Sequence, residues 1–392
     1  MIAITNARIF TMEETGVIAD GEVLIDGDTI RAVGSDLSLP ASVRRIDAGG
    51  CFLLPGLIEA HCHMGITEEK KGREGDDCNE CVRPLTPSLR AIDAINPMDA
   101  AFHSAVAAGI TSAMIGPGSS NVVGGQFALV KTHGRCLDDM IRLAPAAMKI
   151  AFGENPKMNF GEKDESPYTR MAISEMLRKE LRAAACYVKQ VPVTPLPGTE
   201  QDSEKEMRYG CYRPVFAGKI PLKAHVHRAD DILTAIRIAK EYGLSMTLDH
   251  CSEGHLIADK IKESGFPAIV GPSLSSRNKI EVQNMAFKTA GILEKAGVMV
   301  AVTTDHPVSL IQSLPICAAL AVKEGLSMEG GLKAVTIHAA EICRADHIIG
   351  SIREGKKADL VLWKGHPFEL FSKVLFTMID GEIVYRDREM FL

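Results

Sequence analysis

The feature that most constrains the fold is a repeated alternation of short apolar segments with longer periodic ones in the middle of the chain. The segments that read as buried strands are, in order, MKIAFGEN, PLKAHVH, SMTLDHC, PAIVGPS and VMVAVTTDH. Stretches with helical periodicity separate them, at residues 170–189, 230–242, 257–264 and 284–296. Repeating strand–helix units with continuously apolar strands indicate a parallel sheet covered by helices. With about 290 residues and at least seven strands, they predict an α/β fold, a closed (β/α)₈ TIM-type barrel rather than an open sheet.

Both ends of the chain have a different character from the middle. The first fifty residues contain the short strand-like segments ITNARIF, GEVLID and TIRAVG, and the last forty contain DLVLW, VLFTMI and IVY. The last two segments are joined by Asp380-Gly381, which is a hairpin signal. We therefore expect one small β-sandwich domain formed by residues 1–54 plus 350–392, and a barrel formed by residues 55–349.

Composition limits the classes of function. The 392 residues carry 44 Lys and Arg against 50 Asp and Glu, a net charge of −6, which argues against a nucleic-acid partner. No apolar run reaches the ~18 residues of a membrane helix, and Met1 does not begin a signal peptide. Ten cysteines are sparse for a disulfide scaffold and favour reduced thiols in a cytoplasmic enzyme. We expect a small-molecule substrate, no membrane partner and a possible homo-oligomer.

Two His-x-His pairs each follow an apolar strand. His61 and His63 end the segment CFLLPGLIEAHCH, and His225 and His227 end KAHVH. Residues i and i+2 of a strand point to the same side, so both imidazoles of a pair can reach one cation.

Two further strands end in residues that bind metal ions. His250 ends MTLDH, and Asp305 ends VAVTTD. In a barrel the carboxyl ends of all strands meet at one face, where active sites lie. Imidazoles with a carboxylate suit Zn²⁺, with Fe²⁺ or Mn²⁺ as alternatives, so the sequence predicts a site for divalent metal ions.

The order of motifs resembles the amidohydrolase superfamily of metal-dependent hydrolases. The matching segments are PGLIEAHCHMG (Pro55–Gly65), the histidine strands at His227 and His250, TTDHP (Thr303–Pro307) and GSIREGKKADLVLW (Gly350–Trp363). The pattern is most similar to the imidazolonepropionase-like and prolidase-like group. The resemblance implies a (β/α)₈ barrel, a small β-sandwich, one or two divalent metal ions, and hydrolysis of C–N bonds in cyclic amides or dipeptides.

The resemblance also implies roles for individual residues. His61 and His63 would bind the more buried ion together with Asp305. The pattern H-x-A-D at residues 227–230 favours His227 as the next ligand, while His225 would bind metal or substrate. His250 would be either a ligand of a second ion or the group that polarises the scissile carbonyl.

The bridging ligand of a two-metal site is open between two residues of MKIAFGENP. Two-metal relatives use a carboxylated lysine or a glutamate, and Lys149 and Glu154 both qualify. They have opposite strand parity, and Lys149 would lie about five residues deeper, roughly 16 Å along the strand. We expect Glu154 to be the ligand. Otherwise Lys149 forms a buried ion pair, Glu154 binds substrate, and the site holds one ion.

The expected mechanism follows from the ion. A bound divalent metal lowers the pKa of its water from about 16 towards 7 and so supplies hydroxide. Asp305 would act as general base and pass the proton to the leaving nitrogen, while His250 or a second ion stabilises the oxyanion. Arg228 and His306 are candidates for binding the substrate.

Two other classes of function compete with this one. A deaminase of a heterocycle would use the same metal site and release ammonia, and a barrel without activity would serve as a binding module. The complete set of strand-end histidines argues against the second class.

Three segments carry weaker predictions. Residues 67–87 and 191–218 are predicted to be long loops that cover or shape the active site. Cys78 and Cys81 form a C-x-x-C without a second pair at zinc-finger spacing, which favours free thiols in a loop.

Overall fold

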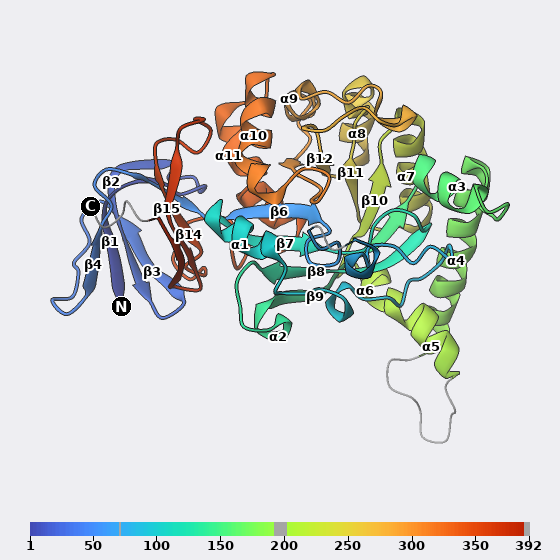
Figure 1. Cartoon of the computed structure of the whole chain (residues 1–392), viewed down its shortest axis with the longest axis horizontal. Helices are drawn as coiled ribbons and strands as arrows, with labels where there is room; N and C mark the ends of the chain where they lie inside the picture. Colours follow the sequence, from blue (N-terminus) through green and yellow to red (C-terminus); the bar gives the residue numbers. More distant parts are fainter. Residues whose placement is uncertain (70–71, 192–201, 388–392) are drawn as a thin grey trace.

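The strands of the protein form two sheets, one at each side of the molecule in Figure 1. The computed structural model describes residues 1–69, 72–191 and 202–387. One sheet combines strands from both ends of the chain, and the other forms the barrel. The predicted boundaries between the two domains stay predictions.

The first sheet has eight strands in the order β16-β15-β14-β5-β1-β2-β3, with β4 paired to β1. Its strands are β1 (Ile2–Phe10), β2 (Val17–Asp26), β3 (Thr29–Gly34), β4 (Arg44–Asp47), β5 (Phe52–Pro55), β14 (Leu360–Lys364), β15 (Lys373–Ile379) and β16 (Glu382–Arg386). The two ends of the chain meet where β14 pairs antiparallel with β5. Both residues of the predicted hairpin, Asp380 and Gly381, have positive φ, as the tight turn between β15 and β16 requires. Folding of this sheet into a sandwich stays a prediction.

The second sheet has eight strands in the sequential order β6 to β13. These are β6 (Leu57–Cys62), β7 (Ile110–Ile115), β8 (Val123–Lys131), β9 (Ile141–Ala151), β10 (Leu222–Val226), β11 (Met246–His250), β12 (Ala268–Val270) and β13 (Val300–Val302). Just beyond the ends of β6 and β13, the amide of His63 donates to the carbonyl of His306 at 2.8 Å. The result is a TIM-type barrel.

The barrel departs from eight strand–helix units at β8, which runs antiparallel to both β7 and β9. Residues 116–122 join β7 to β8, and residues 132–140 join β8 to β9. Both connections are shorter than a crossover between parallel strands, which needs a dozen or more residues. The expectation of eight parallel strands is therefore wrong at this position, although the barrel itself is confirmed.

Helices surround the barrel strands, with α9, α10 and α11 above them in Figure 1 and α2 below. The helices are α1 (Ala100–Ala107), α2 (Leu137–Met140), α3 (Glu154–Gly161), α4 (Arg170–Gln190), α5 (Ser203–Tyr209), α6 (Arg213–Phe216), α7 (Ala229–Tyr242), α8 (Ala258–Ser264), α9 (Lys288–Lys295), α10 (Leu314–Lys323), α11 (Met328–Ala334) and α12 (Ile337–Ile342). Short 3₁₀ turns are η1 (Gly72–Gly75), η2 (Ala91–Asp93), η3 (Gly210–Tyr212), η4 (Gly254–Leu256), η5 (Ile280–Val282) and η6 (Ile311–Ser313). None of these described helices combines the length and apolar character needed to cross a membrane.

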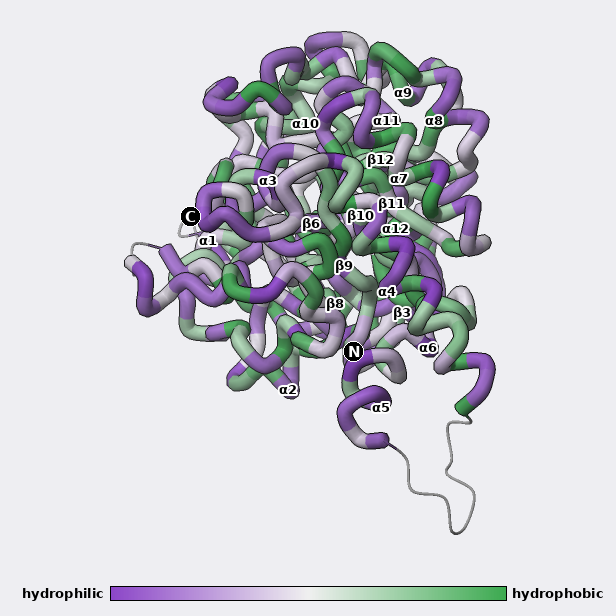
Figure 2. Tube along the Cα trace, turned by 90° about the vertical axis from the view of Figure 1, so that its right-hand side faces the viewer, coloured by the Kyte–Doolittle hydropathy of each residue, from purple (hydrophilic) through white to green (hydrophobic). Residues whose placement is uncertain are grey.

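The helices pack on the barrel through amphipathic faces. In α7 the buried residues Ile232, Ala235, Ile236 and Ala239 follow the i, i+3, i+4, i+7 spacing of one helix face. Gly243 ends this helix in a left-handed conformation with φ 64°. Figure 2 shows hydrophobic segments concentrated in the barrel strands and hydrophilic segments around them. The barrel strands are therefore held from outside by helices.

The interior of the barrel is also packed with side chains. Buried apolar residues from six of its strands form one cluster, with Ile58, Ala60, Met114, Phe127, Ala147, Ile269 and Ala301 as members. This layer closes the barrel beneath the carboxyl ends of the parallel strands, so functional groups can gather only above it.

The predicted helices are confirmed with small shifts of their ends, as α4, α7, α8 and α9. The prediction of a continuous loop over residues 191–218 is wrong for its described part, which contains α5, η3 and α6. Residues 192–201 of that prediction lie outside the described residues.

Candidate metal centre

Six side chains converge in two groups above the packed interior of the barrel. The first group contains His61, His63 and Asp305, and the second contains His225, His227 and His250. In each group the ligand atoms lie within 4.8 Å of one another, and all six residues are buried. These are the strand-end residues that the sequence singles out, so the expected convergence of β6, β10, β11 and the end of β13 is present.

Asp305 joins the two histidines of the first group. Its Oδ1 lies 3.3 Å from Nε2 of His63 and 3.6 Å from Nε2 of His61. The same oxygen is buried and has no hydrogen-bond partner within the described part of the chain. A buried carboxylate oxygen without a partner is costly, and a cation among these three donors would satisfy it. The first group therefore fits a divalent metal ion.

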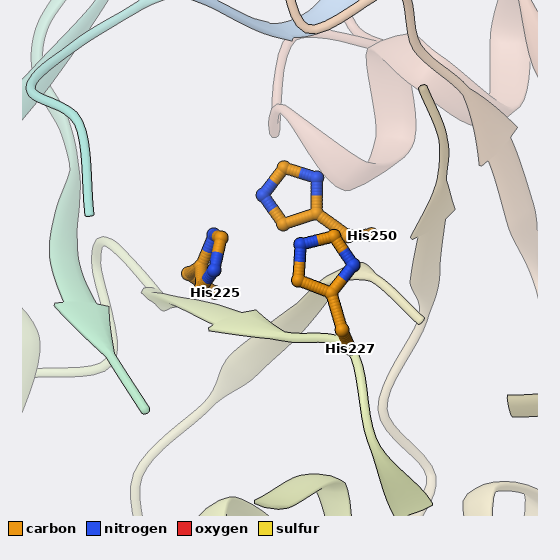
Figure 3. Close-up of side chains that lie close together, drawn as sticks. All are labelled: His225, His227 and His250. Atoms are coloured by element: carbon orange, nitrogen blue, oxygen red, sulfur yellow. The ribbon is translucent and has the colours of Figure 1, made fainter. Parts of the chain in front are cut away.

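The second group consists of three closely packed imidazoles (Figure 3). The ring centroid of His225 lies 4.7 Å from that of His227 and 4.5 Å from that of His250. The rings of His227 and His250 are stacked at 4.7 Å with an interplanar angle of 11°. Three neutral imidazoles with converging nitrogens are a ligand set that suits Zn²⁺ and related ions.

The two groups are adjacent. The ring centroids of His61 and His250 are 5.0 Å apart. Asp305 also approaches the second group, because its Oδ2 lies 3.9 Å from Nδ1 of His250. One substrate atom can therefore be reached from both groups.

Hydrogen bonds at the outer nitrogen orient three of the rings. Nδ1 of His61 bonds to Oδ2 of Asp249 at 2.7 Å, and Nδ1 of His63 bonds to the carbonyl of Gly116 at 2.7 Å. Nδ1 of His250 bonds to the carbonyl of Gly271 at 2.8 Å. A carbonyl or carboxylate only accepts, so Nδ1 carries the proton in each case. In the neutral ring, Nε2 is then left with a lone pair for a metal ion.

A buried ionic network supports His61 from below. Besides its bond to His61, Asp249 lies 3.1 Å from Nζ of Lys223 and accepts a 2.7 Å hydrogen bond from Thr247. Sequence reasoning missed Asp249 and Lys223. The signal was present, because Lys223 has the same strand parity as His225 and His227, and Asp249 directly precedes His250.

Burial sets the protonation of most of these histidines. It lowers the pKa of His61 and of His250 well below the ordinary value, and that of His227 to about 3. Neighbouring positive groups lower them further, and His225 shifts in the same direction. These rings are therefore neutral at pH 7, as metal ligands must be.

His63 behaves differently. Burial alone would lower its pKa, but the negative charges of Cys78 and Asp305 outweigh burial and raise the pKa to about 10. A metal ion bound at Nε2 of His63 must therefore displace a proton.

Two residues of the site have unusual backbone conformations. His250 has φ 76° and Asp305 has φ 52°, in the left-handed region that side chains other than glycine rarely adopt. Such conformations cost about 1–3 kcal/mol and persist where the surrounding structure enforces them. Both occur where a strand ends, which indicates that the chain turns sharply to bring these side chains to the site.

Lys149 and Glu154 occupy different environments. Lys149 is fully buried in β9 opposite Lys223, and its Nζ lies 3.3 Å from Nε2 of His61. Burial lowers its pKa to about 8. Glu154 is the first residue of α3, and its Oε2 accepts a hydrogen bond from the amide of Glu281 at 3.1 Å.

The expectation that Lys149 lies about five residues deeper than Glu154 along one strand is therefore wrong, because β9 ends at Ala151. Gly153, with φ 79°, is part of the turn that leads into α3. In the sheet, Ala151 is paired with His225, so Lys149 lies only two residues below the level of that histidine. Its long side chain spans this distance.

The two predicted substrate-binding residues are already bonded within the protein. Arg228 forms two hydrogen bonds, of 2.9 and 3.1 Å, to the carboxylate of Asp230. His306 is fully buried, and its Nδ1 accepts from the amide of Ile311. Its Nε2 has no hydrogen-bond partner in residues 1–69, 72–191 and 202–387, and burial lowers the pKa of His306 to about 4.

The C-x-x-C pair contains free thiols, as predicted. Cys78 is buried beside His63, while Cys81 is half-buried. A further residue that the sequence did not indicate is Glu281, whose buried carboxylate lies 3.6 Å from Nε2 of His225. It follows β12 in a segment without strand or helix periodicity, so no pattern marked it.

Comparison with known proteins agrees with this architecture. The model of the Amidohydrolase family matches residues 52–384. The crystal structure of an amidohydrolase from Thermotoga maritima superimposes with a TM-score of 0.93 at 38% identity, covering 99% of this chain and 100% of the other.

Two relatives match over most of this chain at lower identity. The amidohydrolase tasK of Hapsidospora irregularis is 25% identical over 94% of this chain, which spans only 40% of that protein. An imidazolonepropionase of Streptomyces avermitilis is 24% identical, covering 88% of this chain and 81% of its own length.

The family match covers far more than half of the chain and includes all six residues of the two groups. The similarity to imidazolonepropionases also agrees with the group that the motifs indicate. The chain therefore belongs to the amidohydrolase family of metal-dependent hydrolases, enzymes that act on carbon–nitrogen bonds.

Proposed function

We propose that this enzyme hydrolyses a C–N amide bond in a cyclic amide or a dipeptide-like substrate. The observation that carries the proposal is the convergence of two buried ligand groups, His61 with His63 and Asp305, and the three histidines beside them. The similarity to an imidazolonepropionase supports the cyclic-amide class of substrate.

We propose that the first group holds one divalent ion and that the second group holds another. Imidazole with carboxylate suits Zn²⁺ best, and Fe²⁺ or Mn²⁺ are the alternatives. When bound, such ions supply Lewis acidity that activates water and polarises the scissile carbonyl.

Lys149 is a better candidate than Glu154 for the ligand shared by both ions. Its amine lies beside His61, whereas the Glu154 carboxylate is bonded to the backbone of Glu281. A pKa of about 8 leaves a substantial fraction of the amine neutral in mildly alkaline solution. A neutral amine can add to CO₂ and lose a proton, which gives the carboxylated lysine that the resemblance implies. Loss of Lys149 should then weaken metal binding more than loss of Glu154.

Asp305 is positioned to move the proton of the reaction. Its Oδ1 has no hydrogen-bond partner among the described residues, so it can accept a proton from the attacking water. As the water oxygen bonds to the carbonyl carbon and the C–N bond breaks, Asp305 returns that proton to the leaving nitrogen. The carboxylate is regenerated, and the products are a carboxylic acid and an amine.

The hydrogen bonds of His250 support a role as ligand over a role as hydrogen-bond donor to substrate. Its Nδ1 proton is engaged with Gly271, and its lowered pKa keeps Nε2 unprotonated. An unprotonated nitrogen cannot donate to a developing oxyanion.

The expected cytoplasmic location is supported by the ten cysteines, which are all free and all lie in the described part of the chain. Free thiols are typical of a reducing compartment.

The activity is tested with a panel of cyclic amides and dipeptides, assayed before and after metal removal. We expect at least one substrate to be hydrolysed, the rate to be lost on chelation and restored by Zn²⁺. Release of ammonia from a heterocycle, without ring opening or peptide cleavage, would instead establish a deaminase. No turnover of any compound by metal-loaded protein would contradict the proposal.

A further inference from the structure

Glu281 is a buried carboxylate beside the second histidine group. It lies in the 3₁₀ turn η5 (Ile280–Val282), and its side chain is 2% exposed. Its Oε1 lies 3.6 Å from Nε2 of His225 and 3.9 Å from Nε2 of His227. The same oxygen has a third neighbour, Lys279, whose Nζ lies 3.5 Å away.

The backbone holds this carboxylate in place through a reciprocal pair of hydrogen bonds. The amide of Glu154 donates to Oε2 of Glu281 at 3.0 Å, and the amide of Glu281 donates to the Glu154 carboxylate at 3.1 Å. Oε2 is therefore fixed by the start of α3, and Oε1 is left facing the histidines.

A glycine makes room for this arrangement. Gly153 has φ 79°, and a Cβ built there would lie 3.0 Å from Oε2 of Glu281 and 2.8 Å from Oδ2 of Asp231. The contact with Asp231 would be too short for a real side chain, and the contact with Glu281 would force its carboxylate to shift. The turn between β9 and α3 is thus shaped to let the Glu281 carboxylate enter.

The spacing matches that of donors around one cation. Zn–N bonds of about 2.0–2.1 Å and Zn–O bonds of about 2.0–2.2 Å in a tetrahedral site place neighbouring donors roughly 3.3–3.5 Å apart. The two observed separations exceed this by only a few tenths of an ångström.

We propose that Glu281 is the oxygen ligand of the second metal ion, completing the site that His225, His227 and His250 form. This inference rests on the second ion of the proposed function. The oxygen ligand would then come from the segment after β12, which supplies no residue to either of the two ligand groups.

The test is metal binding by the whole chain, which does not depend on knowing the substrate. Metal-free wild type and Glu281→Gln are titrated with Zn²⁺ against a competing chelator and with Co²⁺ followed by absorption. Glu180→Gln is the matched control, because Glu180 is an equally buried, ion-paired glutamate on α4 that contacts Arg208 and not the site.

We expect two ions in the wild type and in Glu180→Gln. In Glu281→Gln the first ion should bind as in the wild type, and the second at least about 10–100-fold more weakly. Wild-type affinity for both ions in Glu281→Gln would overturn the inference. A wild-type protein that binds a single ion would also overturn the inference. If that one-ion protein still hydrolyses a substrate, the proposed activity remains supported.

Thermal unfolding shows whether Glu281→Gln is folded. If it is not, Glu281→Asp provides the same test, since it keeps the charge and shortens the side chain by one methylene. Selective weakening of the second ion in this variant supports the assignment, and unchanged binding of both ions overturns it.

Discussion

At the scale of single residues, the site depends on the histidines and equally on the groups that accept hydrogen bonds from their outer nitrogens. Asp249, Gly116 and Gly271 each accept from an Nδ1 nitrogen and so direct the Nε2 nitrogens inward. The strand-end histidines and Asp305 could be predicted because each ends an apolar segment. Glu281 could not, because a contact between distant segments leaves no periodic signal in the sequence.

Asp305→Asn tests the proton-transfer role. Asparagine preserves the shape of the side chain but cannot take up a proton from water, so we expect turnover to fall by about 10²–10⁴-fold. The metal content of the variant is measured alongside the rate, to separate lost chemistry from lost metal. Asp259→Asn, on the exposed surface of α8, serves as the control and should retain wild-type turnover. Near-normal turnover by metal-loaded Asp305→Asn would exclude the assignment.

Glu59 gives a prediction about pH. Burial in β6 raises its pKa from 4.5 to about 7, even though it accepts hydrogen bonds from Thr304 and His61. The folded protein therefore binds this proton more tightly than the unfolded chain does. The free energy of unfolding should fall between pH 4.5 and 7, by on the order of 3 kcal/mol from this group.

Glu59→Gln removes this titration. Urea unfolding of metal-free protein at several pH values should show the stability of the variant rising relative to wild type from pH 5 to pH 7.5. Parallel stability curves for the two proteins would show that the Glu59 proton is not linked to folding.

At the scale of elements, the ends of strands decide what the site contains. The identity of the barrel strands could be predicted from their apolar runs, but the end of β9 could not. The run MKIAFGENP contains a turn residue, Gly153, but an apolar run alone does not show which residue ends the strand, and counting parity through that turn misplaced Glu154.

The end of β12 supports the site through Gly271. This residue has φ 134°, and a Cβ there would lie 2.3 Å from the carbonyl oxygen of Thr303. Its own carbonyl orients His250. We expect Gly271→Ala to lower the free energy of unfolding by about 1–3 kcal/mol and to weaken metal binding, because the backbone must shift.

Gly265→Ala is the matched control for that substitution. Gly265 also has positive φ, at the end of α8, but no atom of the residues that the structure describes lies within 4 Å of a Cβ built there. It should cost about 1 kcal/mol in stability and leave metal binding unchanged. Equal effects of the two substitutions on metal binding would argue against a specific role for the Gly271 carbonyl.

At the scale of the whole molecule, the chain closes on itself. The terminal sheet could be predicted from the strand-like segments at both ends, whereas the direction of β8 depends on connection lengths that the expected strand–helix repeat obscured. Strand β14 covers the edge of β5, which leads directly into β6 and the first two histidines.

A chain that ends at residue 349 tests this dependence. It would lack β14 to β16, and with them the buried side chains of Leu360, Leu362, Phe376 and Met378. We expect it to be aggregated or partly unfolded by size-exclusion chromatography and circular dichroism, because an apolar sheet edge and the remaining part of that core are exposed. A stable monomer with wild-type thermal stability would show that the barrel folds independently.

We propose that strand-end side chains hold the metal on which hydrolysis depends. The most direct measurement is the metal content per chain of purified protein, by mass spectrometry after chelation and reconstitution with Zn²⁺. We predict stoichiometric metal, up to two ions per chain, and loss of at least one ion when His61 and His63 are both replaced by asparagine. Wild-type protein that binds no stoichiometric divalent ion after reconstitution would show that these side chains do not form a metal site.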